Sequence, residues 1–534
     1  MDDILIRGAE VIDGSGAPGR MANVSVHDGR ISAISNEERP AHRVIDATGL
    51  VAAPGFIDIH THSDFTLPLN PRAESKIRQG VTTEVLGNCG FSVAPALPGR
   101  VEMLRDYLAA SAPWLEFHQT TFADYMSSFP ATSVNTIMQV GHHTLRLMAM
   151  GTEDRAPRAD ELRQMQDLLE EALQAGALGL SSGLFTTPGG YASSDEMIAL
   201  GQVLRRYGAG YASHIRDEAN RVFEAVREAI AVGEACDIHV QIAHLKLSGT
   251  DNWGGARELL AEIDAARQRG VQVDCDQYPY TTATNPLRNL LPTWVQAGGM
   301  EAMLQRLREP ETRQRIRQDI EAQGLNNFGR IPSWDDVRIA ISPHQSTYAG
   351  CTIGDIARER SCEPLDAVCD YLIADHGHTR ILITSMDEAD VRTILSSPTV
   401  LVGSDGTSLA PYGVTGQGKP HPRFYGTFPR LLGRYVRDLG LLSLPQAVYK
   451  MTGGSATALG LIERGLLRPG YWADITVFDP QTITDTATYD TPHQYATGIS
   501  TVLVNGNVVI EAGEHTGALP GQVLRHGPDG VGTA

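Results

Sequence analysis

The sequence is short of positive charge. It contains 44 Lys and Arg residues against 63 Asp and Glu residues, which gives a net charge of −19 at pH 7. A surface of this sign repels phosphate backbones and anionic lipids, so nucleic acid and membrane are poor candidates for partners. It also repels small anions at long range. An enzyme of this charge that acts on carboxylates would therefore need a local cationic pocket.

Cysteines are few and long apolar runs are missing. Six cysteines in 534 residues, without a CxxC pair, argue against a disulfide scaffold. No apolar segment approaches the roughly 20 residues that span a bilayer. The acidic start, Met1–Gly8, is typical of a strand rather than of a signal peptide. We therefore expect a cytoplasmic location, where reduced thiols are free to bind metal.

The two ends of the chain resemble each other in pattern. Residues 1–54 hold short alternating strands separated by Gly and Asp turns, and residues 466–534 repeat this pattern. The pair Asn505-Gly506 is a signal for a type I′ hairpin. These two segments flank a long α/β middle, so we expect both ends to form one small β-domain.

Residues 55–465 alternate strands with amphipathic helices. In residues 159–174, for example, apolar residues recur at helical spacing and Gly176 follows the run. Eight strands with intervening helices predict an α/β fold of the (β/α)8 TIM-barrel type, and a doubly wound sheet is the alternative. The predicted strands are 55–60, 81–88, 134–141, 177–183, 209–215, 238–244, 271–276 and 399–405.

A long segment separates the last two predicted strands. Residues 285–398 are too many for a single loop. We expect an inserted subdomain at about residues 285–345. The segment also holds a helix and two strands, 337–341 and 381–384, which the sequence does not place.

Side chains of the kind that bind metals stand at the ends of five of the eight predicted strands, where barrel enzymes place their reacting groups. The first strand ends in two histidines one residue apart, a spacing that directs both imidazoles to one face. A single histidine in such a place is more often structural than a ligand, but five coinciding strand ends favour a shared site. The residues are His60 and His62, Cys89, His214, His244 and Asp405.

These residue types suit zinc. One thiolate and two imidazoles leave the fourth tetrahedral position open to water. Zinc lowers the pKa of a bound water to roughly 7, so hydroxide becomes available at neutral pH. A nearby carboxylate such as that of Asp405 can take up a proton and pass it to a leaving amine. The pattern therefore predicts metal-assisted hydrolysis.

Longer motifs cover nearly the whole chain. They are Gly55–Asp64, Gly87–Gly90, Gly141–Arg146, Ser213–Glu218, His244–Lys246, Asp276–Tyr280, Gly403–Gly406, His421–Arg430 and Arg468–Asp474. In these motifs and their order, the chain resembles the D-aminoacylase (N-acyl-D-amino-acid deacylase) family of the amidohydrolase superfamily. The resemblance implies a barrel, a small β-sandwich or β-barrel domain built from both termini, and an insertion after strand seven.

The resemblance also implies roles for site residues. Cys89, His214 and His244 would hold a tightly bound Zn²⁺. A second, weaker metal position would be lined by His60, His62 and Asp405, with Asp405 also acting as the catalytic acid and base. The α-carboxylate of the substrate would be bound by Arg423 and Tyr278, with a hydroxyl group from Thr284.

The implied reaction is zinc-dependent removal of the N-acyl group from an N-acyl-D-amino acid, giving a D-amino acid and a carboxylate. The partner would be a small molecule with a free carboxylate, which Arg423 can bind bidentately. One alternative keeps the metal site but hydrolyses a cyclic amide, as hydantoinases and dihydropyrimidinases do, or another carboxylate-bearing amide. A second alternative is a non-catalytic scaffold. The sequence indicates no oligomeric state.

Two segments depart from the family pattern. Residues 280–286 differ from the serine-rich version that we associate with the family, which affects the assignment of Thr284. The glycine-rich loop 406–420 is longer than usual. It could form a lid or alter the preference for the substrate side chain.

Overall fold

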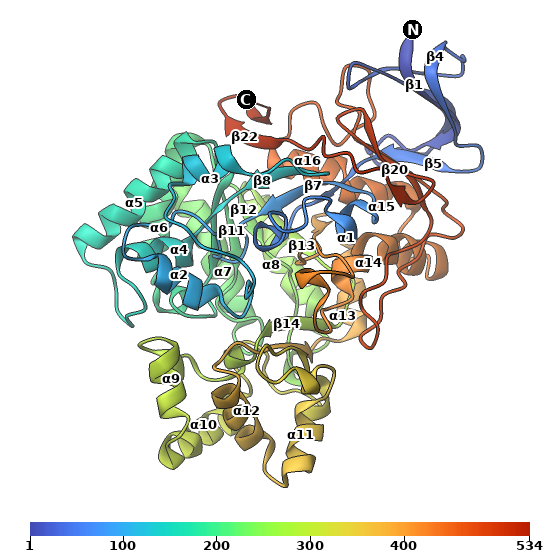
Figure 1. The fold of residues 1–534 in the computed structure, drawn as a ribbon. Helices are drawn as coiled ribbons and strands as arrows, with labels where there is room; N and C mark the ends of the chain where they lie inside the picture. The colour runs from blue at the N-terminus through green and yellow to red at the C-terminus, as the bar shows by residue number, and fades with distance from the viewer. Residues whose placement is uncertain (534) are drawn as a thin grey trace.

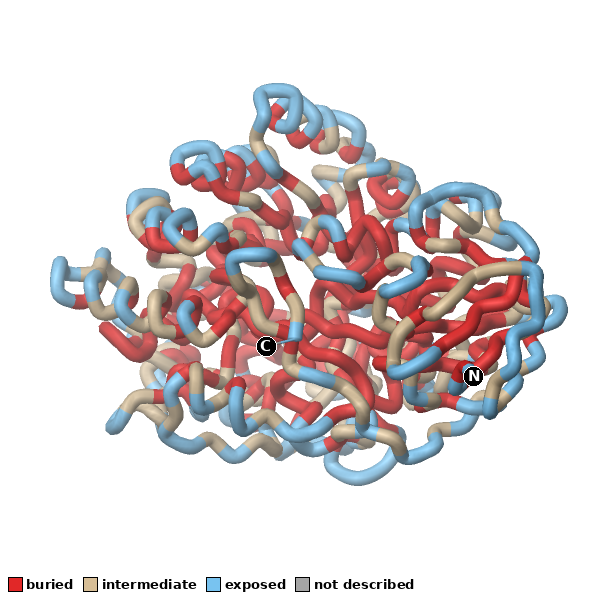
Figure 2. Tube along the Cα trace, turned by 90° about the horizontal axis from the view of Figure 1, so that it is seen from above, coloured by how far each residue is buried: buried red, intermediate tan, exposed pale blue. Residues whose placement is uncertain are grey.

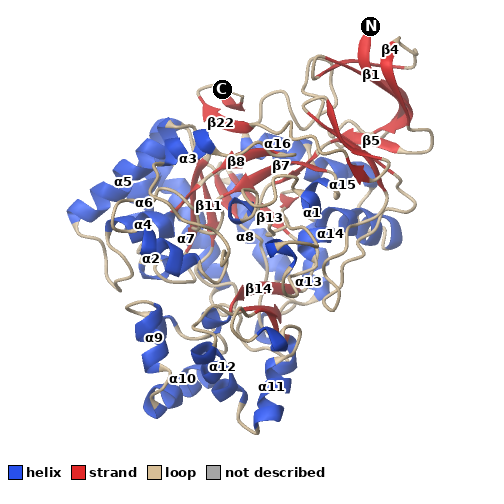
Figure 3. Cartoon of the chain, viewed as in Figure 1, coloured by secondary structure: helices blue, strands red, loops and turns tan. Residues whose placement is uncertain are grey.

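The computed structural model describes residues 1–533 and has three parts (Figure 1). A β-sheet built from both ends of the chain lies beside a central α/β body, and a group of helices, α9–α12, projects from the opposite side. Figure 3 shows the same division, with strands at the centre of the body and helices around them. Along the Cα trace of Figure 2, buried residues concentrate in the interior and exposed residues in the peripheral turns.

The central body is a ring of parallel strands, which confirms the predicted α/β barrel. Each predicted strand range overlaps an observed strand, and neighbouring strands pair in parallel. The bridge between Thr61 and Gly406 joins the last strand to the first. The strands are β6 (Phe56–Asp58), β7 (Val81–Leu86), β8 (Asn135–Met138) with β9 (Val140–Gly141), β10 (Gly179–Gly183), β11 (Gly210–His214), β12 (Val240–Ile242), β13 (Val273–Gln277) and β17 (Val400–Val402).

Helices follow most of these strands and cover the ring. Helix α5 (Ala159–Gln174) has the bounds that its apolar spacing predicts, and it buries Met165, Leu169 and Leu173 against the body. Helix α6 (Ser194–Tyr207) begins where the Ser193 hydroxyl accepts a hydrogen bond from the Glu196 amide. Helices α7 (Val222–Cys236) and α8 (Ala256–Gln268) continue the outer layer.

Both ends of the chain share one nine-stranded sheet. Strand β1 (Asp2–Val11) pairs with β5 (Val51–Pro54), and β5 pairs in turn with β18 (Ile475–Phe478). Strands β19 (Ile499–Val504) and β20 (Asn507–Glu511) are joined by Asn505-Gly506, whose φ angles of 48° and 76° are those of the expected type I′ turn. The remaining strands are β2 (Arg20–His27), β3 (Arg30–Ser35), β4 (Ala41–Asp46) and β21 (Glu514–His515).

The last strands leave this sheet. Strand β22 (Val523–Gly527) pairs in parallel with β8 of the barrel and antiparallel with β23 (Gly530–Gly532). Leu524 is buried beside Ile137, so apolar contact with the barrel favours this position. We expected residues 466–534 to belong to the terminal sheet, but their last strands lie on the barrel instead. The boundaries at residues 54 and 466 stay predictions.

The insertion after the seventh barrel strand is larger than the sequence indicated. Strands β14 (Thr282–Pro286), β16 (Arg380–Thr384) and β15 (Val337–Ile341) form an antiparallel sheet in that order. The central strand is β16, so the inserted layer continues well past residue 345. Its helices are α9 (Met300–Arg306), α10 (Pro310–Gln323), α11 (Ile353–Arg360) and α12 (Pro364–Ala374).

A buried ion pair joins the terminal sheet to the barrel. The Asp474 carboxylate pairs with Arg464 and accepts a hydrogen bond of 2.7 Å from the Asn505 amide. Asn135 of barrel strand β8 donates to the same carboxylate at 3.3 Å. Residue Asp474 thus connects three segments that are far apart in sequence.

Replacing Asp474 by Ala should lower the free energy of unfolding by about 3 to 5 kcal/mol, because Arg464 then remains buried without its partner. Thermal unfolding, followed by circular dichroism, measures the loss. Asp438→Ala, at an exposed position, is the control. Equal melting temperatures for the two variants would contradict this role of Asp474.

Candidate active site

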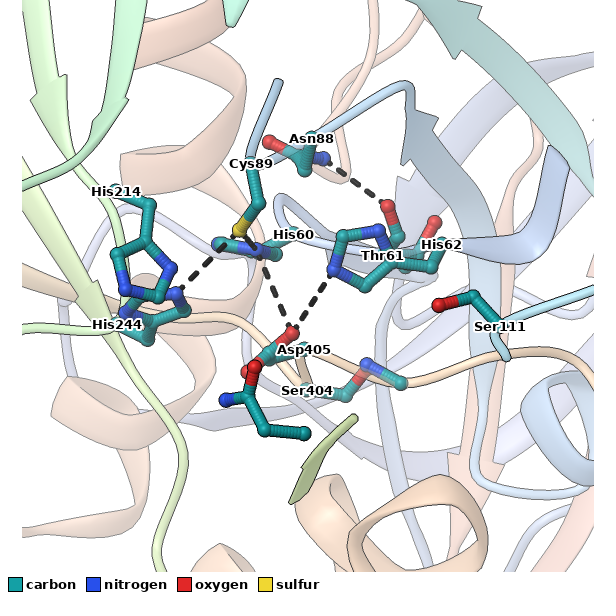
Figure 4. A network of polar contacts seen from close by, with 12 residues as sticks. His60, Thr61, His62, Asn88, Cys89, Ser111, His214, His244, Ser404 and Asp405 are labelled. Carbon is teal, nitrogen blue, oxygen red and sulfur yellow. Dashed lines mark hydrogen bonds and ion pairs between the residues drawn. The ribbon is translucent and has the colours of Figure 1, made fainter. Parts of the chain in front are cut away.

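The six predicted metal-type residues converge at the carboxyl ends of the barrel strands (Figure 4). Three of them have left-handed backbone angles: φ is 54° at Cys89, 35° at His244 and 47° at Asp405. Residues other than glycine rarely adopt these backbone angles, and those that do cluster at functional sites. The turns after β7, β12 and β17 thus aim a thiol, an imidazole and a carboxylate into one space.

The first group of donors consists of Cys89, His214 and His244, whose ligand atoms lie within 4.8 Å of one another. Cys89 Sγ is 3.4 Å from His244 Nε2, and the two imidazole rings are 4.3 Å apart at their centroids. All three side chains are buried. One sulfur and two nitrogens at this spacing fit a tetrahedral metal with one open position.

The second group shares Cys89 and adds His60, His62 and Asp405. His60 Nε2 lies 3.2 Å from Cys89 Sγ and 3.7 Å from Asp405 Oδ1. His62 Nε2 lies 3.1 Å from the same carboxylate oxygen. The donor set therefore fits a second metal position next to the first, with the thiol between them.

Buried partners contact the two imidazoles of the first group. His244 Nδ1 lies 2.7 Å from Lys246 Nζ and 3.0 Å from the Glu218 carboxylate, and Lys246 and Glu218 pair with each other. The His214 ring stacks on Phe185 with centroids 4.0 Å apart. Lys246 and Glu218 thus orient the His244 imidazole.

Asp276 supports both groups. Its carboxylate lies 3.2 Å from His60 Nδ1 and accepts a hydrogen bond of 3.0 Å from the His244 amide. Gln241 donates to it at 2.6 Å. Because this carboxylate accepts a hydrogen bond from His60 Nδ1, the ring proton lies on Nδ1. The Nε2 lone pair of His60 then points into the site.

Asp405 is an ionised carboxylate at the edge of the site. Burial would raise its pKa, but the Arg423 guanidinium, 2.7 Å away, and the His62 imidazole hold that pKa well below its ordinary value. The carboxylate is therefore unprotonated at neutral pH.

Of the three predicted substrate-binding residues, one lines the pocket above the donors and two are buried next to each other. Thr284, on β14, lines the pocket. Arg423, which pairs with Asp405, and Tyr278 are both buried, and the guanidinium carbon lies 4.4 Å from the centroid of the Tyr278 ring. Within residues 1–533, Arg423 Nε, Arg423 Nη1 and the Tyr278 hydroxyl are buried without a hydrogen-bond partner. Buried donors of this kind are expected to meet a polar group.

The glycine-rich loop 406–420 covers one side of the same pocket. Thr407, Leu409, Thr415 and Gln417 all line it. The empty space in and around the pocket, including open solvent, is about 790 Å³. This loop therefore contacts whatever occupies the space above Asp405.

Sequence reasoning missed several residues of the site. Asp276 lies at the end of the seventh strand, β13, so the rule that singled out the other strand ends could have found it. Phe185 and Asn327 gave no such signal, although Asn327 donates to the Glu218 carboxylate at 3.0 Å. Arg380 lines the pocket from the inserted sheet, whose extent the sequence did not reveal.

Comparison with known proteins gives consistent matches over nearly the full chain. A model described as the amidohydrolase family matches residues 43–510. N-acyl-D-aspartate deacylase of Alcaligenes xylosoxydans xylosoxydans is 40% identical and covers 98% of this chain and 95% of its own. The structure of N-acyl-D-glutamate deacylase of Bordetella bronchiseptica was solved with zinc and a phosphonate mimic of the tetrahedral intermediate. It matches with a TM-score of 0.82 at 37% identity, over 98% of this chain and 99% of that one. A structure of D-aminoacylase, described as showing activation by one metal and attenuation by a second, has a TM-score of 0.82 at 36% identity. The match covers 98% of this chain and 100% of that one.

Replacing Asp276 by Asn should weaken divalent-metal binding by about 10- to 100-fold, because the amide can donate to His60 Nδ1 and favour the wrong tautomer. Competition with a chromogenic chelator measures the affinity. Asp274→Asn is a matched control, since this carboxylate on the same strand pairs with His239 and Arg267 instead. Equal affinities in the two variants would contradict the role of Asp276.

Proposed function

Since this chain belongs to the amidohydrolase family, we propose that it is a zinc-dependent deacylase that converts N-acyl-D-amino acids into D-amino acids and carboxylates. The main support is the pair of donor groups that share Cys89, one of which includes the ionised carboxylate of Asp405. The relatives named above, which cover nearly all of this chain, act on N-acyl-D-amino acids by their names. Hydantoin and dihydrouracil have no carboxylate for Arg423, so the cyclic-amide alternative is less favoured.

Cys89, His214 and His244 would hold the tightly bound zinc, and His60, His62 and Asp405 would complete a second, weaker position. The neutral imidazoles and the thiolate are the donors that zinc prefers. When bound, zinc would polarise the acyl carbonyl and lower the pKa of water in the site. The attenuating second metal of D-aminoacylase supports one tight and one weaker position.

Asp405 would move the proton. Its carboxylate, kept ionised by Arg423, takes the proton from the attacking water. It then donates this proton to the leaving nitrogen as the amide C–N bond breaks. The proton thus passes from the nucleophile to the amine through one group, and the products are a free D-amino acid and a carboxylate.

Arg423 and Tyr278 would hold the α-carboxylate of the substrate, with the Thr284 hydroxyl across the pocket. The unpartnered Nη1 and Nε of Arg423 support this assignment, because they can donate to a second carboxylate while Nη2 stays on Asp405. Fixing the α-carboxylate and the scissile amide at two points would send the side chains of the two enantiomers in opposite directions. Selectivity for the D series would follow.

The substrate is a small molecule, in line with a pocket of this size. We also keep the cytoplasm as the proposed location, because all six cysteines are free thiols. In residues 1–533, no helix combines the length and apolar character that a bilayer crossing requires.

A hydrolysis screen of N-acetyl and N-formyl amino acids in both enantiomers tests the reaction. We expect turnover of the D series and a zinc content of at least one ion per chain. Cys89→Ala should lose zinc and activity together, while Cys369→Ala, a buried thiol outside the site, should keep both. Equal rates for D and L substrates would reject the stereochemical claim, and turnover of dihydrouracil alone would favour the cyclic-amide alternative.

Replacing Asp405 by Asn should keep the tightly bound zinc and lower kcat by about 10²- to 10⁴-fold, since the amide cannot carry the proton. Stopped assays at several pH values and metal analysis of the same preparation measure both quantities. Loss of zinc in parallel with activity would instead assign Asp405 to the tight metal site.

A further inference from the structure

A cation other than Arg423, Arg380, lines the pocket above the metal-type residues. It opens the central strand β16 of the inserted sheet, and its cross-strand partners are Pro286 on β14 and Ile341 on β15. All three residues line the pocket. Residues directly opposite one another in antiparallel strands share a face, so this face of the insertion forms one wall of the pocket.

Arg380 has few partners of its own. Its Nη1 donates a hydrogen bond of 2.7 Å to the Ser111 hydroxyl, and Ser111 lines the same pocket. Figure 4 shows Ser111 on the His62 side of the donor cluster. Within residues 1–533, Arg380 has no ion pair with a carboxylate, whereas Arg423 is paired with Asp405.

The surroundings make this guanidinium a site for an anion. It is half-buried, and Trp114, Ile341 and Pro286 give the adjoining wall an apolar character. Burial, together with the nearby Arg423, lowers the pKa of Arg380 to about 10, so it stays charged at neutral pH. A desolvated cation of this kind is stabilised by a carboxylate that arrives with a ligand.

The proposed function already uses one carboxylate of the substrate, the α-carboxylate at Arg423. Arg380, which has no such ion pair, would match a second carboxylate. It would also offset the repulsion between a dianion and a chain of net charge −19.

We propose that Arg380, held by Ser111, binds a carboxylate on the side chain of the substrate, so that the preferred substrates are N-acyl derivatives of acidic D-amino acids. This inference rests on the proposed deacylase function. It makes the inserted sheet the part of the chain that selects the side chain.

The test compares N-acetyl-D-aspartate and N-acetyl-D-glutamate with their neutral counterparts N-acetyl-D-asparagine, N-acetyl-D-glutamine and N-acetyl-D-leucine. The wild-type enzyme should have a higher kcat/KM for at least one acidic substrate than for each neutral substrate. Arg380→Gln should lower kcat/KM for the acidic substrates by about ten- to hundredfold, mainly through KM, and leave the neutral ones within about twofold. Arg380→Lys should recover part of the loss, because it restores the charge.

Arg338→Gln is the matched control, since Arg338 lies in the same inserted sheet but pairs with Asp490. Zinc content and melting temperature should be unchanged in all variants, which separates a binding defect from misfolding. Equal losses on acidic and neutral substrates would place the α-carboxylate at Arg380 and overturn the proposal. A wild-type preference for leucine over both acidic substrates would also overturn it. Absence of turnover on every N-acyl-D-amino acid would instead reject the deacylase function itself.

Discussion

The position of one sulfur atom governs the arrangement of this site. Cys89 Sγ lies within reach of His244 on one side and His60 on the other, so both donor groups depend on the same left-handed turn after β7. A thiol is small and soft, and it can serve two neighbouring positions without a long flexible side chain. The supporting residues Glu218, Lys246 and Asp276 then orient the imidazoles around that fixed point.

Much of the barrel and its chemistry was visible in the sequence because strand ends leave a local signal. A short apolar run that stops at a metal-type residue indicates both the strand and the side chain at its end. The residues at these ends are His60, Cys89, His214, His244 and Asp405. The comparisons confirm the predicted family, fold class and type of reaction. The roles of individual site residues and the domain boundaries stay predictions, although the structure brings the predicted donors within 4.8 Å of one another in each group.

What the sequence did not reveal depends on contacts between distant segments. Asp276 matters because it lies under His60, more than two hundred residues earlier in the chain. The inserted sheet was underestimated because its central strand, β16, comes last in sequence, after four helices that give no hint of the pairing. Arg380 was missed for the same reason, since its position on the pocket wall follows only from that pairing.

The pairing of β5 with β18 and of β8 with β22 bears on how the protein is made. An emerging chain would expose the edges of β5 and β8 until residues 475–527 leave the ribosome, more than 380 residues after each of those strands has been synthesised. Unpaired strand edges are templates for aggregation. Both edges therefore stay open to intermolecular pairing until the C-terminal strands have been synthesised.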